Sequence, residues 1–185
     1  MGYPEELRRL CDNLIDISKE TKLLIVPGGG LFAETIRDAY TKISIPEDIA
    51  HKMAVLAMNQ YGLLLQSLFG DNTTIVEDIN EINDCFEYKN IIIFQVSKMM
   101  HVNNNLPKMW SVTSDSISAH IAQIIGAENL ILIKVIDSLT EQGSDKLLSQ
   151  VNVNVLDSAV KKGCIDDYIQ NILSHNKIQC FIVNG

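Results

Sequence analysis

Four short runs of apolar residues most strongly constrain how this chain can fold. Each run is four residues long and lacks the alternation of polar and apolar residues that a half-exposed strand shows. Uninterrupted runs of this kind are typical of strands covered on both faces, as in a parallel sheet with helices on either side. The sequence therefore predicts an α/β fold with strands at residues 23–26, 91–94, 130–133 and 180–183.

Between these runs, apolar residues recur at intervals of three and four, which is the spacing of an amphipathic helix. Ser44 and Glu47 have the spacing of a capping box, which favours a helix start at that point. We find no linker and no internal repeat, so we expect one α/β domain over residues 1–185. The predicted helices cover residues 5–18, 31–40, 49–69, 116–126 and, more weakly, 165–175.

The helix expected over residues 49–69 is apolar around most of its circumference. Such a helix is either buried at the centre of its own domain or covered by a partner. A single domain of this size has difficulty covering it completely, so we expect a homodimer. The alternative is a central core helix in a monomer.

Charge and cysteine content exclude several classes of protein. The 185 residues carry 15 basic and 23 acidic side chains, a formal net charge of −8, which argues against nucleic acid as the main partner. No apolar run approaches the roughly 20 residues needed to span a bilayer, and the N-terminus lacks the pattern of a signal peptide. The four cysteines lack metal-binding spacing and indicate reduced thiols. We expect a cytoplasmic protein with no membrane partner and no protein-held metal.

The segment Gly28, Gly29 and Gly30 joins the first predicted strand to a helix. Consecutive glycines let the backbone approach a ligand closely, and their N–H groups beside a helix start suit phosphate or carboxylate. A tight turn without a ligand is the alternative. Gly28-x-Gly30-x-x-Ala33 also fits a dinucleotide fingerprint, which would indicate an NAD-binding oxidoreductase. That fold requires a second strand ending in an acidic residue about 20 positions on, where this chain has Pro46 and then a long helix.

Two further polar segments lie next to predicted elements. Thr113, Ser114 and Asp115 precede a helix and are suited to hold a phosphoryl group or orient a cation, although such residues often serve only as a helix cap. Lys134 and Asp137 lie at the end of a predicted strand. Ligands of open α/β sheets bind beyond the carboxyl ends of strands, so these two fall where a nucleotide would lie; the alternative is a surface charge.

Taken together, these segments resemble the amino acid kinase superfamily, which contains acetylglutamate, aspartate and uridylate kinases. The chain is most similar to the archaeal-type branch that includes the aminomethylfuran phosphate kinase of methanofuran biosynthesis. The stretches that carry the resemblance extend over nearly the whole chain, at residues 24–33, 50–62, 110–117, 132–137, 163–166 and 182–185.

The resemblance implies a three-layer αβα sandwich with a mostly parallel central sheet. It also implies a kinase that transfers the γ-phosphoryl group of ATP, with Mg²⁺, to a small acidic or phosphorylated metabolite in methanofuran or one-carbon cofactor biosynthesis. The residues it implicates are Asp115 and Lys134 in catalysis, Gly28, Gly29, Gly30, Thr113 and Ser114 in substrate binding, and Lys134 and Asp137 in nucleotide binding.

Relatives of this kind begin with a strand and a Lys-x-Gly-Gly-Ser loop that embraces the phosphates. This chain begins at the helix that follows that loop, so we expect the first strand to be lacking. Without the loop, we also expect weak nucleotide binding and slow turnover. The alternative to a kinase is a non-catalytic nucleotide- or ligand-binding scaffold of the same fold.

Overall fold

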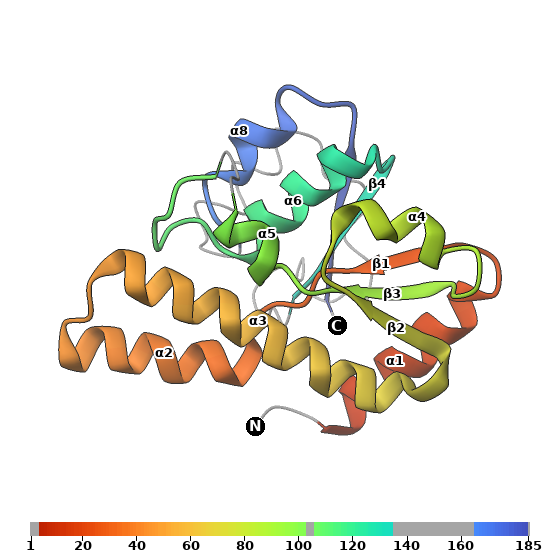
Figure 1. Ribbon diagram of the computed structural model, residues 1–185, viewed down its shortest axis with the longest axis horizontal. Coiled ribbons are helices and arrows are strands. Elements are labelled where there is room, and N and C mark those ends of the chain that lie inside the picture. The colour runs from red at the N-terminus through yellow and green to blue at the C-terminus, as the bar shows by residue number, and fades with distance from the viewer. Residues whose placement is uncertain (1–3, 103–105, 135–164, 185) are drawn as a thin grey trace, which may run out of the picture. The chain divides into compact units, whose positions relative to one another are not determined.

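The computed structural model describes residues 4–102, 106–134 and 165–184, which divide into two compact units on either side of the bond between Trp110 and Ser111 (Figure 1). The helices and strands of the first unit are α1 (Pro4–Ser18), β1 (Leu23–Ile25), α2 (Gly30–Ile43), α3 (Glu47–Phe69), β2 (Thr73–Val76), α4 (Ile82–Cys85), β3 (Ile91–Phe94) and α5 (Ser97–His101). Those of the second are α6 (Ser114–Ile125), β4 (Asn129–Lys134), α8 (Ile169–Leu173) and β5 (Gln179–Asn184).

The first unit contains a parallel three-stranded sheet in the order β1-β3-β2. All four residues of the central strand β3 are buried, as its uninterrupted apolar run predicts. Ile91 and Ile93 point to one face, where they pack with Cys11 of α1 and with Leu65 and Phe69 of α3. The prediction of parallel strands in an α/β fold is confirmed.

The second unit contains a parallel pair, β4 and β5, and here the expectation of burial on both faces is wrong for β4. Leu130 and Leu132 are buried, whereas Ile131 is 56% exposed and Ile133 is 40% exposed. Successive side chains of a strand point to opposite faces. Among the described residues, α6 contacts β4, and the outward face of the strand carries the two exposed isoleucines.

The start of α3 also differs from its prediction. The helix begins after Pro46, which supplies no side-chain cap, and Ser44 instead ends α2 with a φ of 57°. The carboxylate of Glu47 accepts a hydrogen bond from the backbone N–H of Trp110 at 2.8 Å. The capping box is therefore not formed, because Ser44 is the C-cap of α2 and Glu47 accepts from Trp110.

Several other elements were not predicted correctly, and the short helices α4 and α5 are among those with no counterpart in the prediction. Strand β2 has no counterpart in the prediction, and α8 covers five residues of the weak helix expected over residues 165–175. The end of α6 agrees with the prediction, because Gly126 adopts a φ of 67° after its last turn. No helix in the described part of the chain is long and apolar enough to cross a membrane.

Candidate functional site

The second unit holds a buried ion pair between Asp115 and Lys134. Asp115 lies in the first turn of α6, and Lys134 is the last residue of β4. The Lys134 Nζ lies 2.6 Å from Asp115 Oδ1 and 2.7 Å from Oδ2. Asp115 is 4% exposed, and the Lys134 side chain is 24% exposed. The pair thus fixes an ammonium group at the carboxyl end of a parallel strand.

The burial of Asp115 and the charge of Lys134 have opposite effects on the pKa of Asp115. Burial raises the pKa of Asp115 most, and the charge of the Asp166 carboxylate raises it further, while the Lys134 ammonium and a hydrogen bond from the Asp166 N–H lower it. Asp115 thus takes up a proton at a higher pH than an exposed aspartate does. Lys134 is therefore the main group that keeps this carboxylate charged inside the protein.

Asp166 connects the start of α6 to the start of α8. Its carboxylate accepts hydrogen bonds from the N–H and hydroxyl of Thr113, at 3.0 and 2.6 Å, and from the N–H of Ser116 at 3.2 Å. It also accepts from the hydroxyl of Ser116 and, at 3.1 Å, from the N–H of Ile169. Sequence reasoning did not assign Asp166 to a site, because its partners on α6 are about fifty residues away and form no local pattern.

The N–H and hydroxyl donors of Thr113 and Ser116 are consequently used within the unit. Thr113 is the N-cap, and its hydroxyl accepts from the Asp115 N–H at 3.3 Å. The Ser114 carbonyl accepts from the hydroxyl of Ser118. The helix-cap interpretation accounts for these contacts. Asp137 lies outside the described residues.

The glycine segment follows β1 and begins α2, as the sequence predicts. A Cβ on Gly29 would lie 2.4 Å from the Cβ of Ala33, and one on Gly30 would lie 2.4 Å from the ring of Tyr61. Gly30 also has a φ of 49°, which glycine adopts without strain. Packing on α2 and α3 thus requires both glycines whether or not a ligand binds. The helix α3 follows α2 where a dinucleotide fold needs a strand.

A polar cluster lies at the carboxyl end of β3 in the same unit. The Asn59 side chain donates to the Ser97 hydroxyl at 2.6 Å and to Gln95 Oε1 at 3.4 Å. Asn59 lies on α3 between Ala57 and Tyr61, the two α3 residues next to the glycines. The cluster and the glycine segment therefore share the edge of the sheet where α/β proteins bind ligands. Neither Asn59 nor Gln95 was assigned to a site from the sequence.

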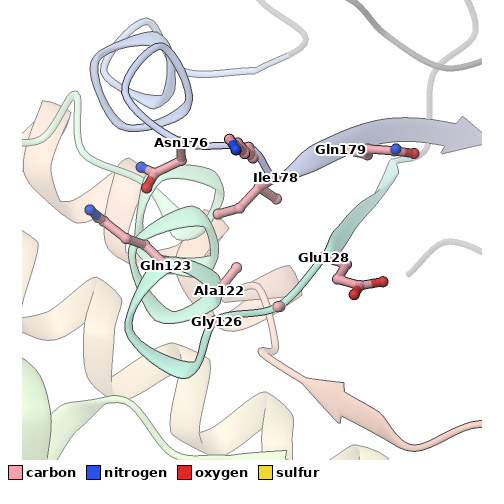
Figure 2. Close-up of a pocket in the computed structure, with 9 residues that line it drawn as sticks. Ala122, Gln123, Gly126, Glu128, Asn176, Ile178 and Gln179 are labelled. Atoms are coloured by element: carbon pink, nitrogen blue, oxygen red, sulfur yellow. The ribbon is translucent and has the colours of Figure 1, made fainter.

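The second unit has a hollow with a volume of about 430 Å³. Its lining includes Gln123, Glu128 and Asn176, which Figure 2 shows. It lies at the amino ends of β4 and β5. Lys134 is at the other end of β4, about 16 Å away along a strand that rises about 3.3 Å per residue. The hollow is thus separate from the ion pair. In the described part of the chain, no three His, Cys, Asp or Glu side chains gather in a metal-binding group.

Comparison with known proteins gives consistent matches. The sequence profile of the amino acid kinase family matches residues 1–184. The [5-(aminomethyl)furan-3-yl]methyl phosphate kinase of Methanocaldococcus jannaschii is 24% identical over 183 residues, which cover 97% of this chain and 82% of that protein. The crystal structure of uridylate kinase from Archaeoglobus fulgidus superposes with a TM-score of 0.72 at 17% identity, covering 100% of this chain and 85% of that one. The last likeness shows the fold.

Proposed function

Because the chain belongs to the amino acid kinase family, we propose that it is an ATP-dependent phosphotransferase whose acceptor is a small phosphate monoester. Membership of the family implies the use of ATP. The observation that carries the proposal is the buried pair of Asp115 and Lys134, which holds a cation at the carboxyl end of β4. Phosphoryl transfer depends mainly on positioning and charge neutralisation, and a fixed ammonium group supplies both.

The acceptor class is suggested by two relatives. One is named as a kinase of an aminomethylfuran methyl phosphate, and the other as a uridylate kinase. Both names describe acceptors that already carry a phosphate group. We propose the same class here, with the furan methyl phosphate of methanofuran biosynthesis as the first acceptor to test.

In the second unit, Lys134 is the residue suited to bind a phosphate group of the nucleotide. When bound, ATP with Mg²⁺ supplies the transferable γ-phosphoryl group and part of the neutralising charge. Lys134 would contact the phosphate oxygens, because its side chain is only partly buried. Asp115 is a positioning residue that holds the ammonium group in place. The start of α6 is less suited to bind phosphate, because Asp166 already accepts from Thr113 and Ser116.

The proposed transfer needs no protein base. An oxygen of the acceptor phosphate bonds to the γ-phosphorus of ATP. The bond between that phosphorus and the β–γ bridging oxygen breaks, and its electron pair stays on ADP. A phosphate monoester has its second pKa near about 6, so the attacking oxygen is already deprotonated at neutral pH. The products are ADP and a diphosphate.

Mg²⁺ would be held mainly by phosphate oxygens, as is usual for this ion. The carboxylate of Asp115 is bound to Lys134, and that of Asp166 accepts several N–H and O–H donors. The glycine segment and the cluster of Asn59, Gln95 and Ser97 are candidates to bind the acceptor, since they line the carboxyl edge of the sheet in the first unit.

Calorimetry with ATP and Mg²⁺ tests the nucleotide site. We expect Lys134→Met to weaken binding by about tenfold or more, the cost of one charge-assisted hydrogen bond. Lys177→Met is the matched control, because Lys177 is an exposed lysine of the same unit. Equal affinity of the two variants would place the nucleotide elsewhere. Tight ATP binding without ADP formation on any phosphate monoester would favour the non-catalytic scaffold.

The homodimer is proposed to form through the outer face of α3. Ile49, Leu56 and Leu63 follow one another at seven-residue intervals and are 41%, 49% and 54% exposed. This spacing forms one apolar stripe along the helix. Light scattering of the wild type and of Leu56→Glu tests the proposal, with dimer expected for the first and monomer for the second. A monomeric wild type at high concentration would refute it.

A further inference from the structure

Asp166 bonds to the ion pair of the second unit and also to the helix that carries it. Its backbone N–H donates to Asp115 Oδ2 at 3.3 Å, and the same oxygen accepts from the Lys134 ammonium at 2.7 Å. Its carboxylate accepts from Thr113 and Ser116, which lie on either side of Asp115 in the chain. Asp166 therefore holds both the Asp115 side chain and the turn of α6 that bears it.

These contacts form a closed ring around Asp115. From Asp115 the ring follows the backbone to Ser116, crosses to the Asp166 carboxylate, and returns from the Asp166 N–H to the Asp115 carboxylate. Because the N–H and the carboxylate belong to one residue, anchoring the carboxylate also sets the direction of the N–H. Rotation of the Asp115 carboxylate would disturb its bond to Asp166 as well as its bonds to Lys134. The ring thus restricts where Asp115 can hold the ammonium group.

The same carboxylate joins a second helix to this ring. Asp166 accepts at 3.1 Å from the N–H of Ile169, the buried first residue of α8. Among the described residues, five donor groups converge on the Asp166 carboxylate. An ordinary N-cap side chain accepts from one N–H of its own helix. Helix capping alone therefore does not account for this arrangement.

The influence of Asp166 on Asp115 is mainly one of position. Burial raises the pKa of Asp115 most and Lys134 opposes it, whereas Asp166 raises this pKa through its charge and lowers it through its N–H. Asp166 thus has no single direction of effect on the charge of Asp115. Its hydrogen bonds, in contrast, all act to hold Asp115 in one place.

We propose that Asp166 is a positioning residue that fixes Asp115 and, through it, the Lys134 ammonium for phosphoryl transfer. This inference rests on the proposed function, in which Lys134 contacts phosphate oxygens of the nucleotide. A lysine side chain is flexible, and its ammonium stabilises a transition state best when it is already held in place. Loss of the Asp166 carboxylate should therefore slow the transfer while the nucleotide still binds.

Kinetics and calorimetry of Asp166→Asn test this role, under conditions where circular dichroism shows the variants to be folded. Asp167→Asn is the matched control, because it removes the same charge from the next residue, an exposed aspartate. We expect Asp166→Asn to lower kcat per nucleotide-binding site by about tenfold or more and to change the Kd for ATP by less than about threefold. Asp167→Asn should leave both within about twofold of the wild type. A merely structural role would lower the number of binding sites and the rate in proportion, and this result would overturn the proposal.

A milder pair of variants serves if Asp166→Asn does not fold. Ser116 and Ser118 are both buried on α6, and the hydroxyl of Ser116 donates to Asp166 whereas that of Ser118 donates to the Ser114 carbonyl. We expect Ser116→Ala to lower kcat per site by about threefold or more relative to Ser118→Ala. Equal rates of these two variants would overturn the proposal.

Nitrogen-15 NMR of the lysine ammonium groups measures the mobility of Lys134 without any assay of transfer. We expect the order parameter of the Lys134 ammonium to fall in Asp166→Asn and in Ser116→Ala, and to keep its wild-type value in Asp167→Asn. If the wild type transfers no phosphate, the proposed function fails and this measurement still decides the positioning. An order parameter that stays at the wild-type value in Asp166→Asn and Ser116→Ala would overturn the proposal, whatever the activity.

Discussion

Removing the Lys134 ammonium tests whether the buried pair of the second unit is as strongly coupled as its geometry indicates. Lys134→Met keeps an unbranched side chain of similar length without the ammonium group. It leaves Asp115, 4% exposed, as a buried carboxylate without its cation. Breaking a buried pair in this way costs about 3–5 kcal/mol. Lys134 is partly exposed and the Asp166 N–H still bonds to Asp115 at 3.3 Å, so we expect the lower end, about 3 kcal/mol.

The sign of the pH dependence follows from the same contacts. Without Lys134, the folded-state pKa of Asp115 rises further above its unfolded value, because burial then acts with little opposition. A group with a raised folded pKa destabilises the fold as the pH rises. The loss in Lys134→Met should therefore be small below about pH 4, the unfolded value for aspartate, and should grow as the pH rises through the folded pKa.

Urea unfolding followed by circular dichroism measures this effect at pH 4 and pH 7. Asp115→Asn and the double variant complete a double-mutant cycle, in which the double variant should cost at least about 1 kcal/mol less than the sum of the singles. Lys177→Met, the exposed control, should stay within about 0.5 kcal/mol of the wild type. Additive single effects, or a loss below about 1 kcal/mol for Lys134→Met, would refute the coupling.

Three further predictions follow from individual contacts. Gly30→Ala should cost at least about 1 kcal/mol more stability than Gly126→Ala. Both glycines have a positive φ, but only a Cβ on Gly30 would meet a neighbouring ring. Equal losses would contradict this and show that Tyr61 moves aside. Asp166→Asn should destabilise the fold by about 2 kcal/mol, because an amide cannot accept from all of the N–H and O–H donors that bond to Asp166. Denaturant titration measures the loss, and an unchanged midpoint would contradict this. Iodoacetamide at pH 8 should label Cys85 but leave Cys180 intact, because burial raises the pKa of the Cys180 thiol to about 12. Mass spectrometry of tryptic peptides measures the difference in labelling. Early labelling of Cys180 would contradict this and show that β5 opens readily.

The sequence predicted those parts of the fold that depend on uninterrupted apolar runs and helical spacing. The run at residues 91–94 became the buried central strand β3, and Gly126 ended α6. Strand β2 was missed because it begins with Thr73 and Thr74. Thr73 is nevertheless buried, and its hydroxyl donates to the Ile91 carbonyl of the neighbouring strand at 3.0 Å. A hydrogen bond of this kind, between two strands, cannot be predicted from local hydropathy.

The candidate site was only partly accessible to sequence reasoning. Asp115 and Lys134 were singled out because each lies at the end of an element where ligands bind in α/β folds. Asp166 was not, because its role depends on contacts with α6 that only the folded chain creates. The glycine segment shows the reverse case. Its pattern favoured a ligand, and the structure adds a packing reason in the close contact of Gly30 with Tyr61.

The most direct test of the proposed function is phosphorus-31 NMR of the chain with ATP, Mg²⁺ and a phosphate monoester. The acceptors are the aminomethylfuran methyl phosphate and uridylate, and the control is the furan alcohol that lacks the phosphate group. We predict that ADP and the coupled resonances of a new diphosphate appear together in equal amounts with a monoester, that the control alcohol gives neither, and that Lys134→Met reduces the rate by about a hundredfold or more. Consumption of ATP at the same rate with and without the phosphate group, or formation of a diphosphate by Lys134→Met at the wild-type rate, would contradict the account.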